Sequence, residues 1–400
     1  MERAVGFLKV LFAESHNLDR PAPLGSHHYI RYFQQAGHDC MWLGPPISPL
    51  HIFKPDALNR QRFKVWRRGG CEVDGIDWLV PLTMFFYYDL PLLRSIAVGR
   101  RQYRYCLPGV GGLLRRKGFD GVDLLWCAGP TAISLLDLVP HRVSCYRLAD
   151  RLDKFSRIPD NVGELQKELI RRVDFVLATS QSLLEWARSE RNNGVYYLPN
   201  GVSDIFFEEQ RKLPHDFPAD GRQVAIYTGT IDTRFDLDLI EYAVRAEKGF
   251  HFLLIGPLTD RRLKPGLEAL QSDDNFTWLG PKAYEQLPAY LQGSTAGLIP
   301  FRLNELTEAV NPIKYYEYLA CGLPVVAPLM RELKAMEGPL HSYGGKESFS
   351  AALREALQER QRDKEEMANK GQSKLQEFAA DQTWFKRFEE VLDIIEKETG

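Results

Sequence analysis

The sequence predicts an α/β protein made of two Rossmann-like domains that face a cleft. Short apolar runs alternate with helical patterns in both halves of the chain, and a Pro-, Asp- and Glu-rich stretch without periodicity, 202–222, separates them. Strands that alternate with helices form parallel sheets with helices on both faces. The 400 residues suffice for two domains of ordinary size. In open sheets of this kind, ligands bind outside the carboxyl ends of the strands.

Each predicted strand is a short apolar or β-branched run. In the first half these runs are 6–13, 38–43, 76–80, 122–128, 141–149, 173–179 and 194–198, and helical periodicity fills gaps such as 26–36 and 161–171. In the second half the runs are 224–230, 251–256, 276–280, 295–301 and 323–327. Beyond residue 330 the pattern is helical and charged to the end. We place the domain boundary at 205/206, after the turn signal LPNGVSD.

Composition excludes several classes of protein. The net charge of −2 argues against a nucleic-acid binder by bulk charge. Six scattered cysteines, without a CxxC pair, favour a reduced cytoplasmic setting. The apolar stretch from Gly6 is broken at Lys9 and Glu14, unlike a signal peptide. The most apolar window, 78–93, is too interrupted to span a bilayer, so we expect a soluble or peripheral protein.

One short helix carries more polar detail than a core helix needs. In NPIKYYEYLACGLPVVA (311–327), Asn311 suits the N-cap and Pro312 the first turn. Gly322 fits the position just past the helix end, and Pro324 prevents its continuation. The helix should therefore span about 312–321 and return to a buried strand.

Two charged side chains of this helix suggest a nucleotide site. Lys314 lies in the first turn, where an ammonium and free backbone N–H groups together suit phosphate. Glu317, three residues later, shares that face and can accept hydrogen bonds from a vicinal diol such as ribose. The alternative is a Lys–Glu ion pair on an exposed face.

Four strand ends precede this helix and should share one rim. They are YTGT (227–230), LIGP (254–257), the run ending at Gly280, and IPF (299–301). Glycine there lets the backbone approach a phosphate, although a glycine after a strand is usually only a turn.

The second half thereby resembles the donor-binding domain of GT-B glycosyltransferases, in which a helix with an early glutamate precedes G-x-P-V-V. Glu317, Gly322, Pro324, Val325 and Val326 match. The resemblance implies that Glu317 binds ribose, Lys314 diphosphate and Thr230 phosphate, with Gly280–Lys282 bordering the base. It extends the donor site to Gly229, Gly256, Phe301, Pro312 and Ile313. Ala309 stands where retaining members often carry an acid. The helix at 383–397 resembles the family's return helix, so we expect residues 383–400 to join domain 1–205 and leave 206–382 as the donor domain.

The first half resembles bacterial exopolysaccharide transferases of the xanthan glucuronosyltransferase and teichuronic-acid type. The resemblance rests on CYRLADRLDKF (145–155) and YLPNGVSD (197–204). It implies that Asp150 is the base that takes a proton from the acceptor. Asp153 is a substitute, and Arg147 would orient the base. Asp150 could instead cap the next helix.

Two further features of the first half bear on the acceptor. His27, in the loop region 13–33, is the preferred catalytic contact, with His16 and His28 as rivals. The segment 59–117 has a net charge of +8 and interleaved aromatic residues. Arg67, Arg68, Arg100 and Arg101 would meet an anionic bilayer and a lipid-linked acceptor. The alternatives are a solvated basic face or a single-stranded nucleic acid.

The function that these patterns favour is transfer of a hexosyl or hexuronosyl group from a nucleotide-sugar, preferably a UDP-sugar, to a lipid-linked saccharide. The enzyme would work in the cytoplasm at the inner face of the membrane, in cell-surface polysaccharide synthesis, and would not bind nucleic acid. No Asp-x-Asp signature follows a first-domain strand, so we expect neither an essential metal nor a cofactor. A GT-B epimerase, a pyridoxal-dependent phosphorylase and an inactive nucleotide-binding scaffold are the rival hypotheses.

Overall fold

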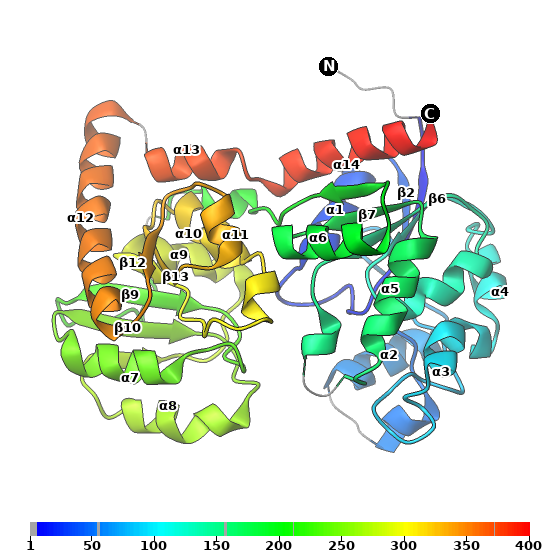
Figure 1. The fold of residues 1–400 in the computed structure, drawn as a ribbon, viewed down its shortest axis with the longest axis horizontal. Helices are drawn as coiled ribbons and strands as arrows, with labels where there is room; N and C mark the ends of the chain where they lie inside the picture. Colours follow the sequence, from blue (N-terminus) through cyan, green and yellow to red (C-terminus); the bar gives the residue numbers. More distant parts are fainter. Residues whose placement is uncertain (1–5, 54–56, 156–157, 211, 372) are drawn as a thin grey trace. The chain divides into compact units, whose positions relative to one another are not determined.

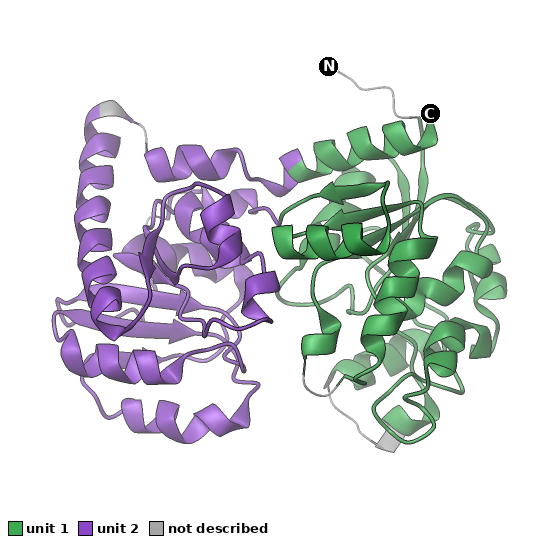
Figure 2. Ribbon diagram, viewed as in Figure 1, with its two compact units in different colours: residues 1–199, 387–400 green, residues 200–386 purple. Residues whose placement is uncertain are grey.

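The computed structural model describes residues 6–53, 57–155, 158–210, 212–371 and 373–400 (Figure 1). The chain forms two compact units, one of residues 1–199 with 387–400 and one of residues 200–386 (Figure 2). The chain thus passes between units after Pro199 and after Lys386, a few residues from the boundaries placed at 205 and 382.

Unit 1 is built on one eight-stranded sheet of order β3-β4-β2-β1-β5-β6-β7-β8. All neighbours are parallel except β3 and β4, which form an antiparallel hairpin. All seven runs predicted in this half contain a strand, and only β3 was missed. The strands are β1 Lys9–Ala13, β2 Asp39–Leu43, β3 Cys71–Val73, β4 Ile76–Leu79, β5 Val122–Cys127, β6 His141–Leu148, β7 Phe175–Ala178 and β8 Val195–Tyr197.

Helices connect the strands of unit 1 and cover the sheet. The α-helices are α1 Gly25–Gln35, α2 Ala57–Arg67, α3 Ile96–Arg101, α4 Val110–Arg115, α5 Val162–Arg172 and α6 Gln181–Glu190. The 3-10 helices are η1 Pro49–Phe53, η2 Gln102–Tyr105, η3 Pro130–Asp137 and η4 Leu152–Lys154. The last helix, α14 Trp384–Thr399, starts in unit 2 and ends in unit 1. Its Phe388 packs edge-on against Phe33 of α1 at 4.9 Å, as expected for a returning helix.

Aromatic side chains fill the centre of unit 1. Phe12 of the central strand β1 stacks on Trp42 of β2 and on Trp126 of β5, at centroid distances of 6.2 and 5.1 Å. The three residues are opposite one another in the parallel register. Burial of such large rings stabilises the sheet by several kcal/mol, roughly 1.5–3 for each. The packing fixes the positions of the strand ends that follow.

Unit 2 contains a six-stranded, fully parallel sheet of order β11-β10-β9-β12-β13-β14. The strands are β9 Gln223–Thr228, β10 Phe250–Ile255, β11 Phe276–Trp278, β12 Ala296–Leu298, β13 Val325–Pro328 and β14 His341–Tyr343. The helices are η5 Asp204–Phe206, α7 Leu237–Ala246, η6 Arg261–Leu263, α8 Lys264–Leu270, η7 Tyr284–Gln286, α9 Leu287–Gly293, η8 Thr307–Ala309, α10 Ile313–Ala320, α11 Arg331–Ala335, α12 Lys346–Lys370 and α13 Lys374–Ala380. In Figure 1, α7 and α8 cover one face and α9 and α10 the other.

The region beyond residue 330 was predicted to be entirely helical, and this is wrong. Residues 341–343 form β14, which pairs in parallel with β13. The strand has only three residues, HSY, and lies at the sheet edge, so it carries no apolar run that a pattern could reveal. Its neighbour β13 is fully buried, as the LPVVA run predicted.

Candidate active site

The helix that the sequence singled out is α10, which begins at Ile313. Pro312 occupies the N-cap position and no side chain caps the helix, so the prediction of Asn311 as N-cap is wrong. Asn311 is instead buried, and its side-chain amide donates to Glu332 Oε1 at 2.9 Å and accepts from the Asn200 backbone N–H at 3.1 Å. Asn311 therefore ties the start of α10 to two other segments of unit 2. The predicted end is confirmed, because Gly322 adopts φ 63° directly after the helix.

Lys314 and Glu317 contact each other. Lys314 Nζ lies 2.8 Å from Glu317 Oε2, and the Tyr284 hydroxyl donates to Glu317 Oε1 at 3.3 Å. Glu317 is only 1% exposed, whereas the Lys314 side chain is 24% exposed. The pair is thus not the exposed surface pair that was the alternative. Burial, reinforced by Glu317, raises the pKa of Tyr284, which keeps its hydroxyl as the donor.

Three glycines mark the carboxyl ends of three neighbouring strands of the unit 2 sheet. Gly229 follows β9, Gly256 follows β10, and Gly280 comes two residues after β11. The Gly229 N–H donates to Ile255 O at 2.8 Å, and the Gly256 N–H to Gly280 O at 2.9 Å. A Cβ on Gly256 would lie 1.8 Å from Gly229 O, so only glycine fits there. The strand ends therefore form one continuous rim of backbone, as predicted.

The other predicted donor-site residues differ in exposure and in the side chains that contact them. Thr230 and Ile313 are partly exposed, and Pro312 is buried. Lys282 is held by Asp216, with Nζ 2.6 Å from Oδ2, and Tyr290 donates to the other carboxylate oxygen. Phe301 is buried and lies under the Arg234 guanidinium, 5.5 Å from the ring centroid.

In unit 1, Asp150 lies two residues beyond β6 and is partly exposed. Its backbone carbonyl accepts from Gln166 Nε2 at 3.0 Å. The predicted substitute, Asp153, makes two hydrogen bonds with Arg151, of 2.8 and 2.7 Å, which lower the pKa of the Asp153 carboxyl. An acid held this firmly by a guanidinium is a poor base.

His27 was expected in a loop, and this is wrong. It lies in the first turn of α1, is 1% exposed, and packs on the Trp42 ring at 4.6 Å. Its Nδ1 accepts from the Leu24 backbone N–H, and Nε2 is 2.9 Å from Asn17 O. Burial lowers the pKa of His27 to about 4. The two ring nitrogens therefore hold the segments before α1 in place, and neither nitrogen is left for a substrate.

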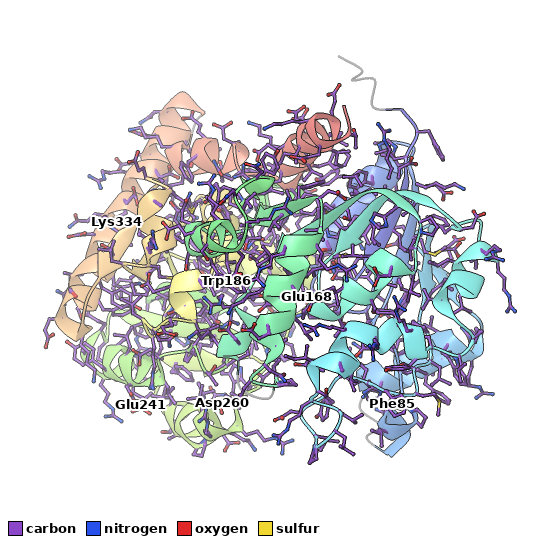
Figure 3. All side chains as sticks on the ribbon, turned by 45° about the vertical axis from the view of Figure 1, so that its right-hand side comes forward. Phe85, Glu168, Trp186, Glu241, Asp260 and Lys334 are labelled. Atoms are coloured by element: carbon purple, nitrogen blue, oxygen red, sulfur yellow. The ribbon has the colours of Figure 1, made fainter. Side chains whose placement is uncertain are left out.

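The four predicted membrane arginines are all exposed. Arg67 ends α2, Arg68 follows it, and Arg100 and Arg101 lie on α3. Arg100 forms an ion pair with Glu168 of α5. Figure 3 labels Glu168, and also Phe85 of the same unit. Unit 1 also exposes large apolar side chains between residues 84 and 107: Met84, Phe85, Tyr88, Leu90, Leu92 and Leu107. No helix in the described ranges is both long and apolar enough to cross a bilayer.

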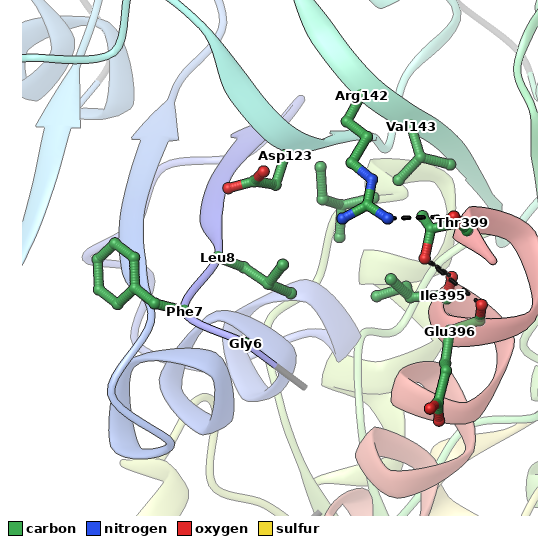
Figure 4. A pocket seen from close by; sticks show the side chains of 10 residues that line it. Gly6, Phe7, Leu8, Asp123, Arg142, Val143, Ile395, Glu396 and Thr399 are labelled. Atoms are coloured by element: carbon green, nitrogen blue, oxygen red, sulfur yellow. Dashed lines mark hydrogen bonds between the residues drawn. The ribbon is translucent and has the colours of Figure 1, made fainter. Parts of the chain in front are cut away.

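A pocket of about 210 Å³ lies at the opposite, amino-terminal edge of the unit 1 sheet (Figure 4). There Arg142 donates to Thr399 O at 3.1 Å, and no predicted site residue lines the pocket. Within the described parts of the chain, no three His, Cys, Asp or Glu side chains gather as metal ligands would. Metal independence itself stays a prediction.

Two α/β units, each built on a parallel or mostly parallel sheet, are the architecture of the GT-B fold. Residues 223–359 match the family described as "Glycosyl transferases group 1". This match contains the glycine rim and α10.

The similar proteins agree with this class. TuaH of Bacillus subtilis (strain 168), assigned as a teichuronic acid biosynthesis glycosyltransferase, is 26% identical over 193 residues, which are 47% of this chain and 48% of TuaH. Sucrose-phosphate synthase from Thermosynechococcus elongatus has a TM-score of 0.68 at 13% identity, over 97% of this chain and 98% of the synthase. HepE of Anabaena, in complex with UDP and glucose, has a TM-score of 0.65 at 13% identity. The match covers 98% of this chain and 100% of HepE. The chain thus matches about half the length of TuaH, and the structures show its fold.

Sequence reasoning missed Tyr284 and Asp216 as neighbours of the site. Tyr284 lies 33 residues before Glu317, and Asp216 lies 66 residues before Lys282. Asp216 stands in the aperiodic stretch 202–222, where no pattern marks any residue. Tyr284 could have been suspected from its place two residues after Lys282.

Proposed function

We propose that the protein transfers a hexosyl or hexuronosyl group from a UDP-sugar to a lipid-linked saccharide in cell-surface polysaccharide synthesis. The observation that carries the proposal is the pair of partly exposed Lys314 and buried Glu317 on α10, inside the matched region 223–359. Two similar proteins support the finer assignment. HepE binds UDP and glucose, and TuaH is assigned to teichuronic acid biosynthesis.

The donor side of the proposal uses the rim and α10. The diphosphate meets Lys314 Nζ and the free N–H groups at the start of α10, while Thr230 and the Gly229 and Gly256 backbones border the phosphates. Once the phosphate competes for the Lys314 ammonium, Glu317 Oε2 can accept hydrogen bonds from the ribose hydroxyls while Oε1 keeps the Tyr284 hydroxyl. Gly280 and Lys282 border the base, and Phe301, Pro312 and Ile313 supply apolar contacts.

On the acceptor side, Asp150 is the base of this proposal and takes the proton from the attacking hydroxyl. As the acceptor oxygen bonds to the anomeric carbon, the bond to the diphosphate breaks and the nucleotide leaves with the electron pair. The cation of Lys314 and the helix N–H groups stabilise the departing charge. No step of this scheme needs a metal.

The proposed contact with the membrane uses unit 1. Exposed Phe85 and Leu92, among the apolar side chains between residues 84 and 107, would enter the lipid interface. Arg67, Arg68, Arg100 and Arg101 would face anionic headgroups of the inner leaflet. Co-sedimentation with phosphatidylglycerol vesicles should fall in Arg67→Glu/Arg68→Glu and in Phe85→Ser/Leu92→Ser, and should be weak with phosphatidylcholine. Equal binding to both vesicles by all variants would exclude this surface.

A thermal-shift panel followed by a transfer assay tests the function. UDP and UDP-sugars should raise the unfolding temperature more than other nucleoside diphosphates, because a ligand stabilises the state that binds it. With a prenyl-diphosphate-linked saccharide, the stabilising UDP-sugar should release UDP and lengthen the saccharide. Conversion of the UDP-sugar alone would indicate an epimerase, and binding without turnover an inactive scaffold.

A further inference from the structure

The start of α10 is held by a buried asparagine that does not cap the helix. Asn311 is 4% exposed, and α10 has no side-chain cap, although asparagine is among the best capping residues. The amide NH2 of Asn311 instead donates to Glu332 Oε1 at 2.9 Å and to the Tyr316 hydroxyl at 3.0 Å. Glu332 is itself buried, so its carboxylate depends on donors such as this one. These two bonds fix the orientation of the amide.

The two carbonyl oxygens of Asn311 accept from Asn200, the first residue of unit 2. The Asn200 backbone N–H lies 3.1 Å from Asn311 Oδ1, and Asn200 Nδ2 lies 2.8 Å from the Asn311 backbone oxygen. Two residues later, Val202 makes backbone hydrogen bonds of 2.9 and 3.0 Å with Gln382 and Trp384. The segment by which the chain enters unit 2 is thus bonded both to the start of α10 and to the segment just before the chain leaves.

The rest of α10 is anchored by other contacts. At its carboxyl end, Gln376 Nε2 of α13 donates to Ala320 O at 3.0 Å. In its middle, Tyr318 is fully buried. The start of the helix carries Lys314, three residues after Asn311. A change at Asn311 should therefore displace Lys314 while the body of the helix stays packed.

We propose that Asn311 is a positioning residue for the nucleotide donor, an inference that rests on the proposed function. It holds the start of α10 where Lys314 can meet the diphosphate of the donor. Because the same side chain accepts from the Asn200 N–H, donor binding and the order of the entering segment 200–202 are coupled through Asn311. Such a coupling is reciprocal, so the bound nucleotide should also steady this segment.

One pair of variants tests the contact between Asn311 and Glu332. Asn311→Asp keeps an acceptor for the Asn200 N–H, but it replaces the NH2 group by a carboxylate beside that of Glu332. Two buried carboxylates at hydrogen-bond distance repel each other, so UDP should bind on the order of 10–100-fold more weakly. Adding Glu332→Gln supplies a donor again, with donor and acceptor exchanged. The double variant should therefore regain most of the affinity.

A matched pair of alanine variants separates positioning from stability. Asn200→Ala removes the side-chain bond to Asn311 and should weaken UDP binding about 3–10-fold. Asn275 is also a buried asparagine of unit 2, and it donates to the Val244 and Phe250 carbonyls just before β11. Asn275→Ala should lower the unfolding temperature at least as much as Asn200→Ala does, but should leave UDP affinity unchanged.

The measurements are calorimetric binding of UDP, thermal unfolding, and hydrogen exchange of the amides at 200–202. UDP should slow this exchange in the wild type and in Asn275→Ala, but not in Asn311→Asp, because only a fixed start of α10 keeps the Asn200 N–H bonded.

Wild-type affinity in Asn311→Asp, or an equal loss of affinity in Asn275→Ala, would overturn the positioning role while leaving the proposed donor intact. Exchange at 200–202 that does not respond to UDP in the wild type would overturn the coupling. A wild type that binds no UDP would refute the proposed function and this role of Asn311 with it.

Discussion

Lys314 Nζ lies 2.8 Å from Glu317 Oε2, one turn along α10, and the carboxylate is buried while the ammonium reaches solvent. The ion pair places a cation near the start of the helix and fixes the carboxylate through Tyr284. It therefore holds both groups in place before any ligand arrives. An incoming phosphate can compete for the ammonium without exposing the carboxylate.

The pair should be energetically coupled. Lys314→Met leaves a buried carboxylate without its cation, which should lower the free energy of unfolding by about 1–3 kcal/mol, since Lys314 is partly solvated. Glu317→Gln should cost less, because the amide keeps its contact with Tyr284. Denaturant unfolding of the double variant should show less destabilisation than the sum of the single variants. Strict additivity would mean that the two side chains act independently.

Gly256 is expected to tolerate no side chain. Its φ is 147° and a Cβ would meet Gly229 O at 1.8 Å, so Gly256→Ala must displace the rim, at a cost on the order of 2–4 kcal/mol. Gly280→Ala is the matched control, since no atom lies within 4 Å of its Cβ position and only its φ of 70° is unfavourable. Gly280→Ala should therefore lower the free energy of unfolding by only about 1–2 kcal/mol. Similar losses of unfolding free energy in both variants would show that the rim is not tightly packed.

His27 should make unit 1 sensitive to acid. Burial lowers its pKa to about 4 from an ordinary 6.5. The neutral ring thus contributes stability that is fully present above pH 6.5 and is lost as the pH falls through about 4. His27→Asn should be less stable than the wild type at pH 7.5, because it loses the contacts of the His27 ring with Leu24 and Asn17. Its unfolding temperature should nevertheless fall less than that of the wild type when the pH is lowered. Exposed His215→Asn is the control and should follow the wild type. Parallel pH curves for His27→Asn and wild type would contradict the burial of a neutral ring.

The sequence predicted the fold well because parallel sheets bury continuous apolar runs. All twelve predicted runs contain strands, whereas β3 and β14, both missed, are three-residue edge strands with exposed positions. Such short edge strands form because a neighbouring strand offers hydrogen bonds, and their own sequence carries little signal.

The site was harder to predict than the fold. Spacing alone placed Lys314 and Glu317 on one face, and their contact follows from the three-residue separation. The role of Asn311 and the burial of His27 depend on residues brought close by folding, such as Glu332 and Trp42. Local patterns assign such residues their commonest role, a cap or a solvated loop side chain, and here tertiary contacts changed it.

Removal of divalent metals should leave turnover intact. The proposed neutralisation of the leaving diphosphate relies on Lys314 and the start of α10. UDP release should therefore be the same with EDTA as with added Mg²⁺ or Mn²⁺. Activity abolished by EDTA and restored by either ion would show that a metal is needed, and Lys314→Met should then weaken UDP binding far less than expected.

The most direct test of the central claim, that Glu317 holds the ribose of a UDP-sugar, is calorimetric binding of UDP and of its 2′,3′-dideoxy analogue. Two hydrogen bonds to a carboxylate should make the wild type prefer UDP on the order of 10–100-fold. Glu317→Ala should bind both ligands with similar, weaker affinity. An equal preference for UDP in wild type and variant, or no preference in either, would contradict the account.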